Sequence, residues 1–296
     1  MIIKKPIFIG GFMRSGTTLL RYLLDSHPNI SCGPETVRFI PELRQYIDNV
    51  LCSEVFVETL DNFNLTEKAF LNLAARDPIA SFFSPFCEAN DKKRWATKTP
   101  SNILHFDFLG RLFPDAHFIH VIRDGRDCLC SLNNVDWWGE PLKNPVTFYN
   151  TAKRWAEYVE TGREHGKNLN YMEITYEDLT ASPKQVLAKI LSFIGEDWDD
   201  ALLSHEKREY KHEVRVDSRN KDGAARPITR QESKWKSKFT EKQSRRFSTI
   251  AGKLLEELGY DITPGHFVKN IYKNKREKAP LNYRAEYRLL ELMGKL

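Results

Sequence analysis

The sequence predicts an α/β fold of three layers, in which a central, mostly parallel sheet is flanked by helices on both sides. The first observation is a buried strand, a glycine turn and the start of an amphipathic helix in residues 7–24. The second is an alternation of further strand-like and helical runs, which favours a parallel sheet covered on both faces. The third is a composition of 41% hydrophobic residues over 296 residues, which permits a sizeable core.

The remaining elements follow in order along the chain. The expected strands after the first are residues 30–32, 117–122 and 169–174. The expected helices are a helical region from residue 35 to about 90, and residues 145–165, 183–194 and 240–258. In sheets of this kind, sites lie at the carboxyl ends of the strands, and Arg14 and Arg123 both fall at such ends.

The first loop has the spacing of a nucleotide P-loop with one change. It reads Gly11-x-x-x-x-Gly16-Thr17-Thr18, and Thr17 stands where the P-loop lysine belongs. Backbone N–H groups at a helix N-terminus still hold an anion, and Arg14 adds a planar fork of donors suited to phosphate or sulfonate. The loop therefore predicts an anion site that does not favour ATP.

A second anion site is expected where the strand 117–122 ends. Arg123 closes that strand, and Ser131 lies eight residues on, about two helical turns later. A guanidinium and a hydroxyl placed in this way can converge on one phosphate. The alternative is that Arg123 to Arg126 form a turn with local salt bridges. Together, the two sites suit a nucleotide that carries phosphates on both sides of its ribose.

Composition argues against several other classes. The net charge of +5 suits an anionic ligand but is too small to predict nucleic-acid binding. No apolar run approaches the roughly 20 residues of a membrane helix, and the first strand begins too early for a signal peptide, so a cytoplasmic location is expected. The histidines are scattered and no Cys-x-x-Cys pair occurs, so we expect no metal site and no disulfide framework. Cys128 and Cys130 are expected to be small packing residues.

With these motifs in place, the chain resembles the sulfotransferases that depend on 3′-phosphoadenylyl sulfate (PAPS). Residues 11–18 resemble the family's 5′-phosphosulfate loop, and residues 121–131 resemble its 3′-phosphate motif. Within the family, the chain is most similar to the tyrosylprotein sulfotransferases, whose Leu-Asp-Ala-His-Pro…Cys-Gly-Glu-Glu-Thr pattern resembles residues 24–36. Further matching strings are Lys98-Thr99-Pro100, residues 111–116, residues 176–179, Ser233-Lys234-Trp235 and residues 258–261.

The resemblance covers about residues 6–262. It implies a P-loop-like fold and a single sulfotransferase domain over residues 1–296, with residues 263–296 as a basic C-terminal extension. Within this domain, residues 205–238 look like a long polar functional loop or lid.

The resemblance also assigns roles to individual residues. Glu35 matches the general base, and Lys98 and Ser233 match residues that stabilise the transition state. Taken alone, the sequence around Lys98 predicts a surface lysine, and Glu35 is open to a second interpretation as a residue at a helix start. The residues matching the PAPS site are Arg14, Ser15, Gly16, Thr17, Thr18, Arg123, Ser131, Tyr176, Ser233, Lys234, Trp235 and Lys238. Two alternatives stay open: that Tyr176 packs in the core, and that Trp235 anchors the loop. His27 is expected to have a structural role at a helix end.

Three departures from the tyrosylprotein pattern bear on specificity. Val37 stands where those enzymes have an arginine two residues after the base, and Val135 replaces an arginine that follows the 3′-phosphate serine. Cys32 matches half of a disulfide in those secretory enzymes, but the partner position is Ala96, which is consistent with a reducing compartment. The resemblance thus implies the PAPS chemistry, while a tyrosyl-peptide acceptor does not follow from it.

The expected reaction is sulfuryl transfer from PAPS to an acceptor hydroxyl, with no metal. The acceptor is a peptide tyrosine, a glycan, a lipid headgroup or a small molecule, and Trp137 and Trp138 could shape its cleft. A homodimer is left open. The alternatives are a P-loop kinase or NTPase, against which Thr17 argues, and a degenerate nucleotide-binding protein.

Overall fold

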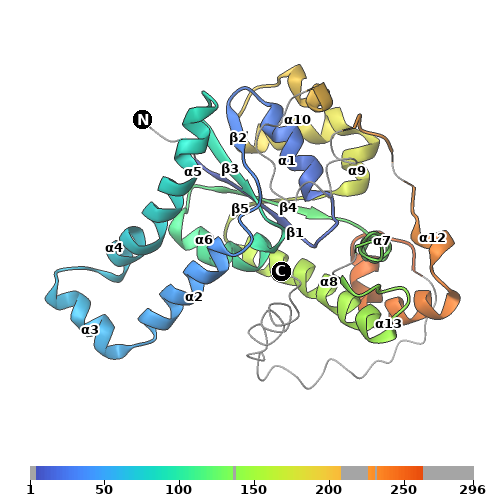
Figure 1. Cartoon of the computed structure of the whole chain (residues 1–296), viewed down its shortest axis with the longest axis horizontal. Helices are drawn as coiled ribbons and strands as arrows, with labels where there is room; N and C mark the ends of the chain where they lie inside the picture. Colours follow the sequence, from blue (N-terminus) through green and yellow to red (C-terminus); the bar gives the residue numbers. More distant parts are fainter. Residues whose placement is uncertain (1–4, 136–137, 208–225, 231, 263–296) are drawn as a thin grey trace. The chain divides into compact units, whose positions relative to one another are not determined.

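The computed structural model describes residues 5–135, 138–207, 226–230 and 232–262. Strands alternate with helices along the chain (Figure 1). The elements are β1 (Ile7–Gly11), α1 (Thr17–Ser26), β2 (Ile30–Cys32), α2 (Phe39–Leu51), α3 (Glu54–Asn62), α4 (Glu67–Leu71), η1 (Asn72–Arg76), α5 (Asp77–Ala89), β3 (Arg94–Lys98), η2 (Pro100–His105), α6 (Phe106–Leu112), β4 (His117–Ile122), α7 (Gly125–Leu132), α8 (Pro145–Gly166), β5 (Asn170–Thr175), α9 (Tyr176–Ala181), α10 (Pro183–Ile194), η4 (Asp200–Lys207), α12 (Trp235–Lys238) and α13 (Glu241–Glu257).

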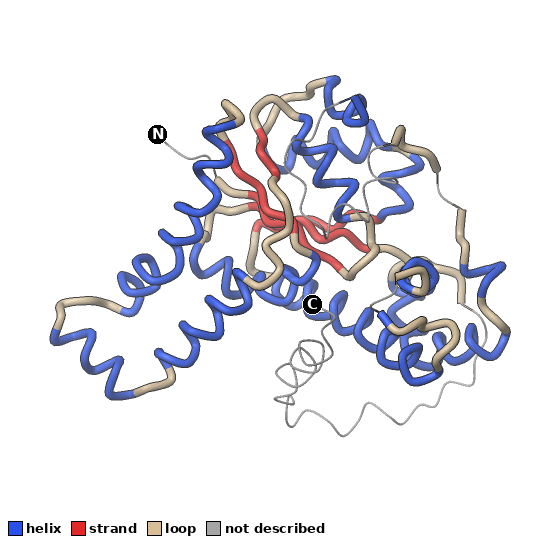
Figure 2. Tube along the Cα trace, in the orientation of Figure 1, coloured by secondary structure: helices blue, strands red, loops and turns tan. Residues whose placement is uncertain are grey.

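The described strands form one five-stranded sheet in the order β2-β3-β1-β4-β5, and every pairing is parallel. The strand β1 is central, with Ile9 opposite Lys98 on one side and Ile119 on the other. The predicted parallel α/β fold is therefore confirmed, and the carboxyl ends of β1, β3 and β4 lie at one edge of the sheet (Figure 2).

The two faces of the sheet are packed differently. On one face, aliphatic residues of the strands contact α1, α9, α10 and η4 in a single cluster that includes Ile9, Leu20 and Ile190. On the other face the packing is aromatic, and the ring of Phe8 lies 5.3 Å from that of Phe118 and 5.5 Å from that of Trp95. Both faces of β1 and β4 are covered in this way, which is why these two strands read as apolar runs.

Among the five strands, β3 is the one that the sequence analysis does not predict. It reads Arg-Trp-Ala-Thr-Lys, with a charged residue at each end, and all five of its residues are buried. Burial of two cations within five residues requires partners from elsewhere in the chain, and a local pattern does not reveal them. The interpretation of Lys98 as a surface lysine is wrong, since its exposure is 0%.

The chain divides into two compact units. The first unit contains residues 1–128 and 155–233, and the second contains residues 129–154 and 234–296. In the second unit, the ring centroids of Phe148 and Phe239 lie 5.4 Å apart, and the indole of Trp138 donates a hydrogen bond to Thr151 Oγ1 at 3.0 Å. That residues 1–296 form a single domain remains a prediction.

Several other expectations concern side chains and segments. All five cysteines are free thiols, and Cys128 and Cys130 are buried as expected. His27 ends α1 and accepts a hydrogen bond from the backbone N–H of Asn29, which confirms its structural role. No helix within the described ranges is long and apolar enough to cross a membrane. Most of the 205–238 loop, Trp137 and the tail beyond residue 262 lie outside the described residues.

Candidate active site

The loop between β1 and α1 has a backbone geometry that suits the predicted anion site. Arg14 and Gly16 adopt positive φ angles of 69° and 94°, and the backbone N–H of Ser15 donates to the carbonyl of Phe12 at 3.1 Å. This conformation delivers the chain into α1 at Thr17, with no side chain capping the helix N-terminus. The N–H groups of the first helical turn therefore lack a side-chain acceptor, and the helix dipole adds to their attraction for an anion.

The ring of Tyr176 covers this loop. A Cβ atom added at Gly16 would lie 2.2 Å from the ring, so the position accepts only glycine. The guanidinium of Arg123 stacks on the same ring with its Cζ 4.3 Å from the centroid. Burial raises the pKa of Tyr176, so the phenol stays neutral. Tyr176 therefore connects the ends of β4 and β5 to the loop, and it also packs against the aliphatic core cluster. Its contact with a nucleotide stays a prediction.

Two guanidinium groups meet at this loop. Arg123 Nη1 donates to the backbone carbonyl of Arg14 at 3.1 Å. Burial, and next to it the positive charge of Arg123, lower the pKa of Arg14. Like charges brought together under partial burial favour an anion between or beside them. Arg14 and Arg123 are therefore neighbours, and the sequence prediction that they serve one ligand stays a prediction.

Arg123 is held in place but is not saturated. Its carbonyl accepts a hydrogen bond from the indole of Trp155 at 3.0 Å. Its Nε atom is buried and has no acceptor among the described residues. A buried guanidinium N–H without an acceptor is costly, so the residues present fit an anionic group of a ligand at this point.

The neighbouring turn also carries the local ion pair that was the alternative interpretation. Arg126 binds the Asp124 carboxylate through Nε and Nη2, at 2.9 Å and 2.7 Å, and both side chains are buried. This pair stabilises the turn after β4, while Arg123 contacts the first loop. The local salt bridge of the alternative interpretation is therefore present, at Arg126, while the phosphate role of Arg123 stays a prediction.

Glu35 and Lys98 form a buried ion pair beside the loop. The side chain of Lys98 is 0% exposed and that of Glu35 is 8% exposed. The Lys98 ammonium donates both to Glu35 Oε1 and, at 3.2 Å, to Thr18 Oγ1 in the first turn of α1. The helix α2 begins only at Phe39, so Glu35 is not a helix-start residue, and this second interpretation is wrong. The pair predicted to be catalytic is thus in direct contact with the anion loop.

The other predicted site residues are placed as follows. Ser15 and Thr17 are buried in the loop, and Ser15 Oγ lies 3.8 Å from Cys128 Sγ. Ser131 is half-buried on α7, in the second unit. Ser233 is exposed in the coil before α12 at the end of the first unit, and Lys234, Trp235 and Lys238 belong to the second unit. Their roles, like those of the loop residues, remain predictions.

Two contacts of the site carry no sequence signal of their own. The hydroxyl of Thr99 accepts from the backbone N–H of Thr36 at 3.1 Å, which fixes the residue next to Glu35. Trp155 positions Arg123 from α8. The string Lys98-Thr99-Pro100 resembles one in the tyrosylprotein sulfotransferases, but nothing in it indicates that the threonine fixes the chain beside Glu35.

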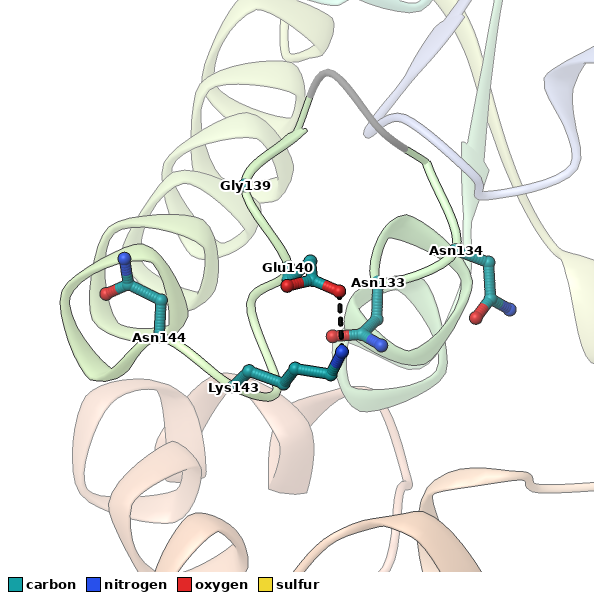
Figure 3. A pocket seen from close by; sticks show the side chains of 6 residues that line it. All are labelled: Asn133, Asn134, Gly139, Glu140, Lys143 and Asn144. Atoms are coloured by element: carbon teal, nitrogen blue, oxygen red, sulfur yellow. Dashed lines mark hydrogen bonds and ion pairs between the residues drawn. The ribbon is translucent and has the colours of Figure 1, made fainter.

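A surface recess of about 510 Å³ lies in the second unit (Figure 3). The polar groups around it serve the loop itself, because Asn133 Oδ1 accepts from Leu142 N and Asn144 Oδ1 accepts from Val146 N, both at 2.9 Å. None of the predicted site residues is among those that line it, which are Asn133, Asn134, Gly139, Glu140, Lys143 and Asn144.

The sequence of this chain is similar to those of known sulfotransferases. The profile of the sulfotransferase family matches residues 6–200. The protein-tyrosine sulfotransferase of Drosophila melanogaster is 30% identical over 266 residues, which are 86% of this chain and 51% of that protein. Protein-tyrosine sulfotransferase A of Caenorhabditis elegans is 29% identical over 265 residues, 86% of this chain and 67% of that protein. The chain spans about half the length of the Drosophila relative.

Among solved structures, the sulfotransferase domain of the Synechococcus PCC 7002 olefin synthase superposes with a TM-score of 0.57 and 22% identity. The match covers 89% of this chain and 98% of that domain. The sulfotransferase domain from the curacin biosynthetic pathway gives a TM-score of 0.54 at 18% identity, over 88% and 99% of the two chains. These likenesses concern the fold.

Proposed function

Because the chain belongs to the sulfotransferase family, we propose that it moves a sulfuryl group from PAPS to an acceptor hydroxyl, with a peptide tyrosine as the leading acceptor. The two relatives described above are named protein-tyrosine sulfotransferases, which supports this acceptor. A glycan, lipid or small-molecule hydroxyl is the alternative. The two units would then serve one sulfotransferase domain, and the compartment and assembly stay predictions.

One observation carries the proposal: the Lys98 ammonium contacts both Glu35 and Thr18. Transfer requires an acceptor oxygen on one side of the migrating group and the leaving oxygen on the other. A carboxylate and an anion loop joined through one buried cation provide groups for both sides. The bond to Thr18 places the Glu35–Lys98 pair next to the loop that is expected to hold the 5′ end of the donor.

The residues fit the donor as follows. Arg14, Ser15, Gly16, Thr17 and Thr18 would hold its 5′ end, and Arg123 and Ser131 would hold its 3′-phosphate. The donor supplies an activated sulfuryl group on a phosphate leaving group. Tyr176 restricts the space above Gly16, and Lys234, Trp235 and Lys238 follow Ser233 in the segment expected to close over the nucleotide.

The side chains of the site would then accept the proton of the acceptor and stabilise the negative charge of the leaving group. The carboxylate of Glu35 accepts the proton of the acceptor hydroxyl as that oxygen forms its bond to sulfur. The ammonium of Lys98 and the hydroxyl of Ser233 donate hydrogen bonds to the leaving oxygen as negative charge develops there. Burial of Lys98 strengthens this interaction, since water does not screen it.

The first test is a calorimetric titration with adenosine 3′,5′-bisphosphate, AMP and ATP in the presence of a chelator. We expect the bisphosphate to bind most tightly, without magnesium. The Arg123→Ala variant should lose about 10- to 100-fold in affinity for the bisphosphate and far less for AMP, as for a lost charge-assisted hydrogen bond. Equal losses for both ligands would contradict the role of Arg123. Magnesium-dependent preference for ATP would overturn sulfuryl transfer in favour of a kinase.

A further inference from the structure

Glu35 lies in a stretch of chain that is neither helix nor strand. The strand β2 ends at Cys32, and the helix α2 begins at Phe39. Backbone between such elements has no ladder of hydrogen bonds to hold it, and a glutamate side chain has several rotatable bonds of its own. The position of the Glu35 carboxylate therefore depends on the individual contacts that this stretch makes.

Two adjacent residues at the end of β3 hold two adjacent residues of this stretch. The ammonium of Lys98 donates to the carboxylate of Glu35. The hydroxyl of Thr99 accepts from the backbone N–H of Thr36 at 3.1 Å. The carbonyl of Thr36 in turn accepts from the backbone N–H of Phe39 at 2.9 Å, where α2 begins. The carboxylate and the backbone beside it are thus fixed by separate bonds.

The hydroxyl of Thr99 serves this stretch in place of its own helix. Thr99 is the residue before η2, and its exposure is 2%. A threonine at a helix start commonly accepts from an N–H of the first turn. In η2, all of which the structure describes, the side chain of Thr99 makes no such bond. The carbonyl of Thr99 accepts from Asn102 N at 2.9 Å, so the backbone that carries the hydroxyl is itself held.

From these contacts we propose that Thr99 is a positioning residue for the reaction: through the N–H of Thr36, it holds Glu35 where the carboxylate meets the acceptor hydroxyl. This inference rests on the proposed function, because it takes Glu35 as the base. In that function Lys98 also donates to the leaving oxygen, so its bond to Glu35 weakens as the transfer proceeds. The bond from Thr36 to Thr99 is uncharged and does not change during the transfer. It keeps the base at the short distance that proton transfer requires.

The first test compares substitutions at Thr99 itself. Thr99→Val keeps the shape of the side chain and removes the acceptor, while Thr99→Ser keeps the acceptor. Turnover is measured as adenosine 3′,5′-bisphosphate released from PAPS in the presence of a short N-acetylated, amidated peptide with one tyrosine. We expect Thr99→Val to lower kcat by about 10- to 100-fold, as for a base displaced by a fraction of its reach. The KM for the peptide and the affinity for the bisphosphate should stay within about twofold, and Thr99→Ser should restore kcat.

The matched control is Thr97→Val. Thr97 lies two residues earlier on β3, so its side chain leaves the strand on the same side as that of a residue at 99. Its exposure is 1%, and its hydroxyl has no hydrogen-bond partner among the described residues. The control removes a buried hydroxyl without removing a bond, so kcat should match the wild type. An unchanged kcat in Thr99→Val, or an equal loss in Thr97→Val, would overturn the positioning role and leave sulfuryl transfer intact.

A double-mutant cycle tests the same contact without turnover. The full chain is unfolded in urea as the wild type, Thr99→Val, Glu35→Gln and the double variant. If Thr99 holds Glu35 against Lys98, Thr99→Val should cost less once the carboxylate is gone, and the two effects on the unfolding equilibrium constant should differ from independence by about threefold or more. Effects that multiply within about twofold would mean that Thr99 only anchors the chain, which overturns the inference. Loss of bisphosphate binding or of turnover in the wild type would instead count against the proposed function, and the cycle would then decide alone whether Thr99 holds Glu35.

Discussion

The two ends of β3 each hold a buried ion pair, and the pairs differ in what surrounds them. At the amino end, Arg94 Nη1 lies 3.3 Å from Glu196 Oε1, with the side chains 2% and 1% exposed. Its guanidinium also donates to the backbone carbonyls of Lys5 and Ile194 and to His117 Nδ1. At the carboxyl end, Lys98 binds Glu35 and the hydroxyl of Thr18.

The difference separates a structural ion pair from the one that we propose to be functional. Taking two charges out of water costs several kcal/mol, so a buried pair persists only where further bonds or a function compensate. The fork of Arg94 is bonded to carbonyls from two other segments, and it ties the chain together. The point charge of Lys98 is bonded to two side chains of the candidate site. Burial alone therefore does not distinguish the pair that we propose to be catalytic, whereas the chemical nature of its partners does.

Removing the Glu35 carboxylate, at the carboxyl end of β3, should have the largest effect. We expect Glu35→Gln to slow turnover by about 10²–10⁴-fold, since a general base is lost while the amide still accepts a bond from Lys98. Affinity for adenosine 3′,5′-bisphosphate should stay within about threefold, because the anion loop is unchanged. Single-turnover rates and calorimetry on the same samples measure the two effects. Unchanged turnover would remove Glu35 from the mechanism.

Breaking the pair at the other end should reduce stability instead. Arg94→Met removes the cation that faces the buried Glu196 carboxylate, which keeps its hydrogen bond from Asn29, so the free energy of unfolding should fall by about 3–5 kcal/mol in a urea titration. Replacing Glu196 by leucine in the same chain should recover most of this loss. Turnover per folded molecule should match the wild type. A variant that is stable but inactive would show that the amino end also serves the reaction.

How far the sequence predicts the site can be judged from these residues. The loop from Gly11 to Thr18 is local, so its spacing and its position between an apolar run and an amphipathic run were enough to predict an anion cradle. The positive φ of Arg14 and the cover formed by Tyr176 depend on the tertiary structure. They could not be read from the spacing.

The strand β3 shows the limit more clearly. Its two cations indicate a surface segment until their partners are known, and those partners lie 63 residues before Lys98 and 102 residues after Arg94. Sequence periodicity reports on neighbours within a few positions. Only the resemblance assigned a role to Lys98, and no resemblance assigned one to Arg94. The contact between Phe39 and Phe82 could not be predicted for the same reason, because these two residues are distant in sequence.

The smallest effect should come from His117, which sharpens the structural side of the comparison. Its Nδ1 accepts from Arg94 Nη2 at 2.8 Å, so a proton there would break the bond and place two cations together. Burial, followed by the charge of Arg94, lowers the pKa of His117 to about 4, against about 6.5 in an unfolded chain. Between these values the unfolded state binds the proton and the folded state does not, so stability falls as the pH drops from about 6.5 to 4. His105 and His120 also have pKa values of about 4 and add to the same trend.

The contribution of His117 is therefore taken as the difference between the wild type and His117→Asn in urea titrations across that range. We expect this difference to change by about 1–2 kcal/mol between the two ends, after allowance for partial exposure. A difference that does not vary with pH would mean that His117 does not sense the charge of Arg94, and the amino-end pair would then be independent of its neighbour on β4.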